Sequence, residues 1–186
     1  MDYEVIRSDR KTYSVEIREA KMLVRAPLHA TNEEINTFLL KHKAWIEKHL
    51  QKAQTRQAEM ANITPLTIPE FRQLVDKALV VIPARVRHYA PLIGVTYGRI
   101  TIRNQHTLWG SCSNTGNLNF NCMLMLAPPE VLDSVVVHEL CHRKEMNHSQ
   151  RFYEEVLRVF PDYWQWNKWL KENGSRLLRM MPNYGA

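Results

Sequence analysis

The first sixty residues change from a strand-like to a helix-like pattern of apolar positions. Between residues 13 and 19 apolar side chains occupy every second position, which predicts a half-buried strand. Two short apolar stretches, residues 3–7 and 22–25, predict two more strands. From residue 31 to residue 50 apolar positions recur every three or four residues, and residues 31–34 match a capping box. We therefore expect a small sheet followed by one helix.

The middle of the chain predicts a second helix and then three strands. The polar stretch at residues 51–62 ends the first helix or links it to the next, and a second capping box opens a helix at residues 67–70. Pro83 should kink or interrupt that helix, because proline lacks an amide proton. Residues 95–103, 108–113 and 117–126 predict strands, and residues 113–116 form a good turn between the last two.

Asparagines alternate with apolar residues in the third of these strands. Leu118 and Phe120 share one face, and Asn119 and Asn121 share the other. A polar outer face is typical of a strand beside a cleft, to whose edge an extended peptide can add by backbone hydrogen bonds. A plain solvent-exposed face explains the same pattern equally well.

Residues 128–137 predict a helix that continues through the sequence H-E-L-C-H at residues 138–142 and ends near Met146-Asn147. Side chains four residues apart lie on one helix face, so His138 and His142 can bind one metal ion. Two neutral imidazoles supply two of the three protein ligands of a catalytic zinc ion, which leaves one position for water. Glu139 is then placed to take a proton from that water and to deliver it to the leaving group.

The third ligand must come from outside this helix. His148 is the preferred candidate, because Asn147 before it tolerates a left-handed turn that would bring the chain back under the metal. Ser149 would then cap a helix over residues 150–159. Glu154 and Glu155 are the rival ligands. Cys141 is expected to be a small buried residue, with metal ligation as the alternative.

Aromatic residues gather in the last predicted helix, which begins at residues 161–162 and ends at Asn173-Gly174. We interpret the cluster of Tyr163, Trp164, Trp166 and Trp169 as a core that braces the metal site. A stacking platform for nucleic acid is the alternative.

Several motifs resemble the YgjP-like (DUF45) metallohydrolases, which are similar to the SprT and WSS1 zinc peptidases of the wider zincin group. The motifs are L-W-G-S-C-S at residues 108–113, L-N-F-N at 118–121, V-V-V-H-E-L-C-H at 135–142, N-H-S-Q-R-F-Y at 147–153 and F-P-D-Y at 160–163. Two positions depart from the family pattern: Leu108 stands where a basic residue is expected, and Tyr153 where a tryptophan is expected. Either departure could alter substrate preference.

The resemblance implies an α+β fold with a zincin-like core, in which an antiparallel or mixed sheet packs on helices and the H-E-x-x-H helix carries the active site. It implies three histidine ligands, His138, His142 and His148, with Glu139 as general base. The predicted function is hydrolysis of peptide bonds in a peptide or protein substrate, with one Zn²⁺ per chain. We expect substrate contacts from Trp109, Asn119, Asn121 and Tyr153. Candidate donors to the oxyanion are Tyr153, Tyr163 and His106.

A length of 186 residues predicts one domain, with strands and a helix at residues 1–60 and the catalytic core at residues 67–175. The acidic N-terminus lacks the apolar stretch of a signal peptide, and no apolar run reaches membrane-spanning length. Three cysteines, an odd number without a C-x-x-C pair, argue against a disulfide framework. These features predict a cytoplasmic protein without a membrane partner.

The formal net charge of +6 is concentrated in the middle of the chain, where residues 61–127 carry six basic and two acidic side chains. A basic surface can attract phosphate or nucleic acid, although a solvated face is the commoner explanation. Two alternative functions follow. One is a nucleoside triphosphate pyrophosphohydrolase that uses the same metal site, with added Mg²⁺. The other is a DNA-associated protease of the SprT type. A structural metal domain is disfavoured, because structural zinc sites have four protein ligands.

Overall fold

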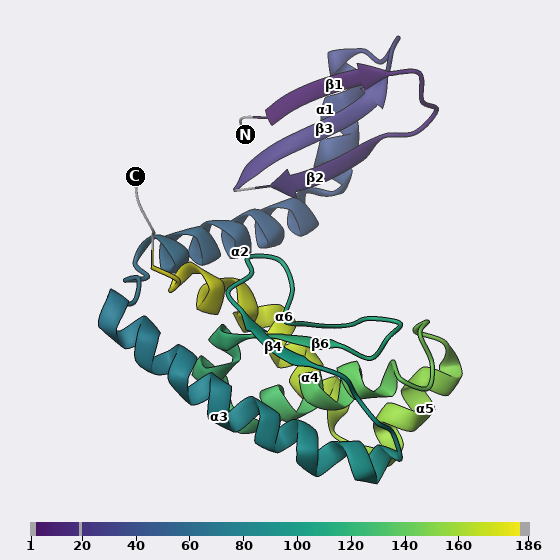
Figure 1. Cartoon of the computed structure of the whole chain (residues 1–186). Helices are drawn as coiled ribbons and strands as arrows, with labels where there is room; N and C mark the ends of the chain where they lie inside the picture. The colour runs from purple at the N-terminus through teal and green to yellow at the C-terminus, as the bar shows by residue number, and fades with distance from the viewer. Residues whose placement is uncertain (1–2, 19, 183–186) are drawn as a thin grey trace. The chain divides into compact units, whose positions relative to one another are not determined.

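A computed structural model describes residues 3–18 and 20–182 of the chain (Figure 1). The chain divides into two compact units, Met1–Ile63 and Thr64–Ala186. Each unit has its own cluster of buried apolar side chains. The prediction that residues 1–186 form a single domain stays a prediction.

The first unit is a three-stranded mixed sheet with two helices. Its strands are β1 (Tyr3–Ser8), β2 (Ser14–Arg18) and β3 (Lys21–Pro27). The central strand β3 pairs parallel with β1 and antiparallel with β2. The helices are α1 (Asn32–Lys41) and α2 (Lys43–Ala61), and α1 lies across one face of the sheet (Figure 1). Val24, Ile35 and Ile46 are fully buried between sheet and helices.

The first predicted helix is two helices, which corrects the expectation of one helix from residue 31 to residue 50. The capping box at Thr31 is present, but α1 ends at His42, whose amide donates to the carbonyl of Leu39. The polar stretch at residues 51–62 was expected to end the helix or act as a link, yet α2 continues to Ala61. Its alanine, lysine, glutamine and glutamate residues are strong helix formers, which explains the extension. Glu19, the last residue of the predicted second strand, lies outside the described residues.

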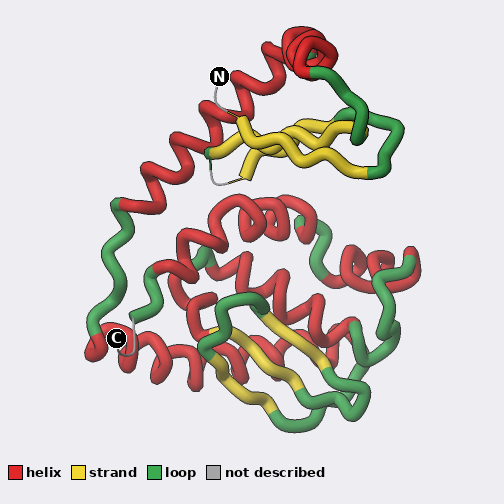
Figure 2. Tube along the Cα trace, turned by 90° about the horizontal axis from the view of Figure 1, so that it is seen from above, coloured by secondary structure: helices red, strands yellow, loops and turns green. Residues whose placement is uncertain are grey.

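The second unit packs five helical segments and a small sheet around one core. In chain order its elements are α3 (Ile68–Ile93), β4 (Ile100–Arg103), β5 (Gly110–Cys112), β6 (Leu118–Asn121), the 3₁₀-helix η1 (Cys122–Leu126), α4 (Pro129–Cys141), α5 (Gln150–Val159) and α6 (Tyr163–Arg179). The sheet has the order β4-β6-β5, parallel between β4 and β6 and antiparallel between β6 and β5. Figure 2 shows the strands of this unit on one side of its helices.

Helix α3 is continuous through Pro83, so the predicted interruption is wrong. The helix begins with the expected capping box of Thr67 and Glu70 and ends at Gly94, whose φ of 80° is a left-handed cap. Eight of its residues are buried along one face. This extensive packing compensates for the hydrogen bonds that Pro83 and Pro91 cannot make.

The predicted strands over residues 95–103 and 117–126 are too long. Residues 95–99 are not strand, because Gly98 donates its amide to the carbonyl of Gly116 and Arg99 donates to the side chain of Asn117. Strand β6 ends at Asn121, whose side-chain oxygen accepts from the amide of Met123 and so starts the helical turn η1. Local side-chain hydrogen bonds of this kind compete with strand pairing.

Helix α4 lies at the centre of the second unit. It packs against α3, α5, α6 and β5. Ten of its thirteen residues are buried, which agrees with its run of valines. The helix ends at Cys141, so the predicted end near Met146-Asn147 is wrong; the amides of Lys144 and Glu145 both donate to the carbonyl of Cys141 in the turn that follows.

Helix α6 begins after Asp162 as expected, but it continues past Asn173-Gly174 to Arg179. The predicted end of that helix is therefore wrong, and Gly174 has a different role that is described below. The predicted α+β class, with small sheets packed on helices, is confirmed.

A buried carboxylate on α4 forms hydrogen bonds with two side chains of α3. Asp133 is 8% exposed, and its carboxylate accepts from Arg85 Nε at 2.6 Å and from the hydroxyl of Tyr89 at 3.1 Å. Arg85 is among the basic residues of the middle segment, and this pairing occupies its guanidinium. The ion pair is partly open to solvent, because the side chain of Arg85 is 36% exposed.

Asp133→Ala should lower the free energy of unfolding by about 2 kcal/mol, because it leaves Arg85 and Tyr89 without their acceptor. The value lies below that of a fully buried pair because Arg85 is partly solvated. Urea unfolding measures the change, and Asp76→Ala on the exposed side of α3 is the control, with a change within about 0.5 kcal/mol. Equal stabilities of the two variants would contradict this account of the α3–α4 contact.

Candidate metal centre

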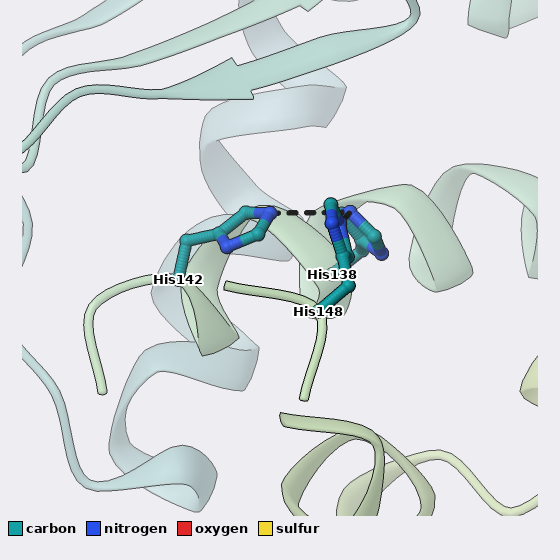
Figure 3. A group of neighbouring side chains, drawn as sticks. All are labelled: His138, His142 and His148. Atoms are coloured by element: carbon teal, nitrogen blue, oxygen red, sulfur yellow. Dashed lines mark hydrogen bonds between the residues drawn. The ribbon is translucent and has the colours of Figure 1, made fainter. Parts of the chain in front are cut away.

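Three imidazoles converge where α4 ends and α5 begins (Figure 3). His138 lies in the last turn of α4, His142 is its C-cap residue and His148 lies in the loop before α5. The Nε2 atom of His138 is 3.3 Å from that of His142 and 3.0 Å from that of His148. Side-chain nitrogens of all three histidines lie within 4.8 Å of one another. Helix α4 places His138 and His142 on one face, and the loop after the helix brings His148 back toward them.

The opposite ring nitrogens of two histidines meet groups that fix their orientation. Nδ1 of His142 lies 3.1 Å from the carbonyl oxygen of Glu145, which can only accept a hydrogen bond. His142 therefore carries its proton on Nδ1 and leaves a lone pair on Nε2. Nδ1 of His138 lies 2.8 Å from the hydroxyl of Tyr163, and the amide of Asn167 donates to the same hydroxyl at 3.1 Å. Such outer contacts orient histidine ligands in metal sites.

A buried phenyl ring supports all three imidazoles. Phe152, in the first turn of α5, is fully buried, and its ring centroid lies 4.9 Å, 4.6 Å and 4.9 Å from those of His138, His142 and His148. Burial and the two neighbouring imidazoles lower the pKa of His138 to about 3. Burial also lowers the pKa of His142. Both rings are therefore neutral near pH 7, which is the form that binds metal.

Glu139 lies beside the histidines, on the side of the sheet. It is 6% exposed, and burial raises the pKa of its carboxyl group to about 8. A Cβ atom on Gly110 would lie 2.6 Å from Oε1 of Glu139 and 2.7 Å from its Cγ. The absence of a side chain at residue 110 thus allows α4 to approach β5 closely enough to bury the glutamate against the strand.

A cavity of about 160 Å³ adjoins Glu139 and His138. Trp109 forms one wall, and Leu170 and Asn167 of α6 form another. The indole of Trp109 lies directly over Gly174, where a Cβ atom would be 2.8 Å from Cζ2. Gly174 therefore permits a close contact between Trp109 and α6, and it does not end the helix.

The predicted substrate-binding residues lie in different surroundings. Trp109 lines the cavity, and Tyr153 stacks on His148 with ring centroids 6.2 Å apart. The amide of Asn119 donates to Ser111 of the neighbouring strand. Asn121 is 1% exposed and donates to the carbonyls of Gln105 and Leu108, so its amide is engaged within the protein. Roles in substrate binding for these residues stay predictions.

The rival metal ligands are engaged elsewhere. Glu155 pairs with Lys144 and Arg158, and Glu154 accepts from Gln150. Cys141 is fully buried beneath the site. Among the candidate donors to an oxyanion, Tyr163 contacts His138, Tyr153 contacts His148 and His106 is an exposed residue between β4 and β5.

The sequence analysis assigned no role to Asn167 or Gly110, and it assigned Gly174 the wrong one, the end of a helix. Asn167 lies four residues after Tyr163 on α6, so helical spacing could have suggested their contact. Gly110 was visible within the W-G-S-C-S motif, but its partner Glu139 follows 29 residues later. Only the fold brings such distant residues together.

The model of one protein family matches almost the whole chain. The family is described as YgjP-like, metallopeptidase domain, and the match covers residues 11–73 and 70–173. The chain belongs to the YgjP-like family. The predicted family and the predicted enzyme class, a metal-dependent hydrolase, are confirmed. Membership implies a metal ion and a peptide or protein substrate, and the cluster of His138, His142 and His148 could bind such an ion.

Solved structures resemble part of this YgjP-like protein. The metallopeptidase zymogens of Pyrococcus abyssi abylysin and Methanocaldococcus jannaschii jannalysin align with 50% of the chain at 20% and 21% sequence identity. The alignments cover 94% and 95% of those chains, and both have a TM-score of 0.45. No curated protein matches the chain. Within residues 3–18 and 20–182, no helix is long and apolar enough to cross a membrane.

Gly110→Ala should lower the free energy of unfolding by about 1–3 kcal/mol, because the new methyl group overlaps the carboxylate of Glu139. Chemical denaturation measures the change. Thr107→Ala, an exposed position in the segment before β5, is the control and should change stability by less than about 0.5 kcal/mol. Wild-type stability of Gly110→Ala would show that Glu139 does not depend on this close approach.

Proposed function

We propose that this YgjP-like protein is a zinc-dependent peptidase in which His138, His142 and His148 bind the ion and Glu139 acts as general base. The convergence of three imidazoles beside a buried glutamate carries the proposal. A catalytic zinc site has three protein ligands and one open position, whereas structural sites have four. His148 is preferred over Glu154 and Glu155 because the two carboxylates are paired with other side chains.

The spacing of the histidine nitrogens supports zinc as the bound ion. Zinc–nitrogen bonds of about 2.0–2.1 Å in a tetrahedron hold neighbouring nitrogens about 3.3–3.4 Å apart. The Nε2 atoms of His138 and His142 are 3.3 Å apart, and those of His138 and His148 are 3.0 Å apart. Two of the three separations are thus close to those around tetrahedral zinc, and the third is within 4.8 Å. A set of three imidazole nitrogens is a ligand set that catalytic zinc sites use, so these residues fit the ion.

Bound zinc would supply a Lewis acid that polarises a carbonyl group and lowers the pKa of water. Glu139 would accept a proton from the attacking water on one of its carboxylate oxygens and then deliver it to the leaving amine. Its burial against Gly110 holds the carboxylate in place and excludes bulk water from around it. A neighbouring cation favours the ionised carboxylate, which opposes the effect of burial.

The contact between Tyr163 and His138 would hold the first ligand in its binding orientation. An imidazole that binds metal through Nε2 keeps its proton on Nδ1, and this proton would donate to the hydroxyl of Tyr163 at 2.8 Å. Tyr163 is thus a positioning residue in this proposal. The alternative functions, nucleotide pyrophosphohydrolysis with Mg²⁺ and DNA-associated proteolysis, stay predictions, as does cytoplasmic localisation.

Elemental analysis of protein purified without chelator should find about one zinc ion per chain in the wild type and little in His148→Ala. Glu139→Gln should keep its zinc but lose at least about 100-fold in kcat/KM on an unfolded protein substrate, because the amide cannot accept a proton. Glu154→Gln is the control and should match the wild type in both measurements. Full activity of Glu139→Gln would refute the general-base role.

Tyr163→Phe should weaken zinc binding by about 10- to 100-fold, because His138 loses the partner of its Nδ1 atom. Competition with a chromophoric chelator measures the affinity. Tyr153→Phe removes the hydroxyl of a neighbouring tyrosine and should leave zinc affinity unchanged. Equal affinities of Tyr163→Phe and the wild type would show that this hydrogen bond does not support the site.

A further inference from the structure

We propose that the cavity beside Glu139 binds an uncharged apolar side chain of the substrate, next to the bond that is cut. The inference rests on the proposed peptidase function and adds to it a substrate class. The cavity touches both Glu139 and His138, so a group that fills it lies next to the position where water would attack. A substrate side chain bound there would set the register of the peptide in the site.

The volume of the cavity suits one side chain of moderate size. It measures about 160 Å³. An apolar cavity of about 150 Å³ in another protein binds benzene, so a space of this size holds a ring or a branched aliphatic group. Leucine, methionine and phenylalanine side chains match this volume, whereas alanine would leave most of it empty.

The walls of the cavity favour an apolar guest. Trp109, Val135 and Leu170 provide apolar surface. Two polar side chains on the wall already donate to partners within the protein. Ser134 donates to the carbonyl of Val131, and Asn167 donates to the hydroxyl of Tyr163. A polar guest would leave water and could not use these two donors, so it would regain fewer hydrogen bonds than it loses, which is unfavourable.

Charged guests are disfavoured for two different reasons. No lysine or arginine lines the cavity, so the carboxylate of an aspartate or glutamate side chain would meet no cation. It would also lie close to Glu139, which carries like charge when ionised. A lysine or arginine side chain would pair with Glu139 and compete for the carboxylate that must accept a proton. Specificity for neutral apolar residues follows from both effects.

Leu170 offers a direct test of the cavity wall. It is 7% exposed and lies on α6. Its replacement by alanine enlarges the cavity, so the preferred substrate residue should become larger. Leu177 provides a matched control, because it lies on the same helix and is 8% exposed but does not line the cavity. The two alanine variants remove the same atoms from similarly buried positions.

The experiment is cleavage of a peptide library by the zinc-loaded protein, with cut sites identified by mass spectrometry. In the wild type, one position beside the cut bond should favour leucine, methionine or phenylalanine over aspartate or lysine by at least about 10-fold in kcat/KM. Leu170→Ala should shift that preference toward tryptophan by about threefold or more, and Leu177→Ala should keep the wild-type preference. Leu170→Val serves the same purpose if the alanine variant does not fold.

A second measurement tests the cavity without any reaction. Titration of the zinc-loaded wild type with toluene should give a saturable shift of the Trp109 indole resonance, identified with Trp109→Phe. Leu177→Ala should retain this shift. Absence of a saturable shift would overturn the apolar cavity as a binding site.

The outcomes separate this inference from the proposed function. Cleavage with no preference for apolar residues, or with a preference that Leu170→Ala and Leu170→Val leave unchanged, would overturn the inference and leave the peptidase intact. Failure of the zinc-loaded protein to cut any peptide would overturn the proposed function, and the substrate assignment with it.

Discussion

Burial of helix α4 is the constraint on which the candidate site depends. The helix packs against α3, α5, α6 and β5, and ten of its residues are buried. This packing fixes the positions of His138, Glu139 and His142 before any ligand is bound. All three side chains are polar groups in a largely apolar environment, where an unpaired charge is costly. This cost is offset by the neutral form of the His138 and His142 imidazoles and by their hydrogen bonds to Tyr163 and Glu145, and in the proposed function also by a metal ion.

Glycines at two positions make the close packing around α4 possible. Gly110 allows β5 to lie against Glu139, and Gly174 allows α6 to lie against Trp109. The same two contacts shape the cavity, because Trp109 and Gly110 line it together with Glu139. The packing around α4, the position of the proposed general base and the space for a substrate side chain therefore depend on the same contacts. A substitution at either glycine should affect all three, and the surrounding core has little room to adjust.

The sequence was most informative where a local pattern has one physical interpretation. The valine run and the four-residue spacing of His138 and His142 predicted a buried helix with both rings on one face, and the motifs predicted the family. The left-handed turn predicted at Asn147 is wrong, because among residues 3–18 and 20–182 Ala20 is the only non-glycine residue with a positive φ. The structure nevertheless brings the three rings together. Ser149 caps α5 as expected.

Sequence patterns were less informative where distant residues or local hydrogen bonds decide the conformation. The cap that Asn121 provides to η1 shortened a predicted strand, and the packing of α3 outweighed the effect of Pro83. The contacts of Gly110 with Glu139 and of Gly174 with Trp109 join residues far apart in the chain. Periodicity describes one element at a time, so it contains no information about such contacts.

X-ray absorption at the zinc edge tests the central claim most directly. The zinc-loaded wild type should show three nitrogen ligands at about 2.0–2.1 Å and one further oxygen ligand from water. This result would establish a three-histidine site with an open position. A sulfur ligand at about 2.3 Å, or four protein ligands without water, would contradict the assignment of His138, His142 and His148 as the complete ligand set.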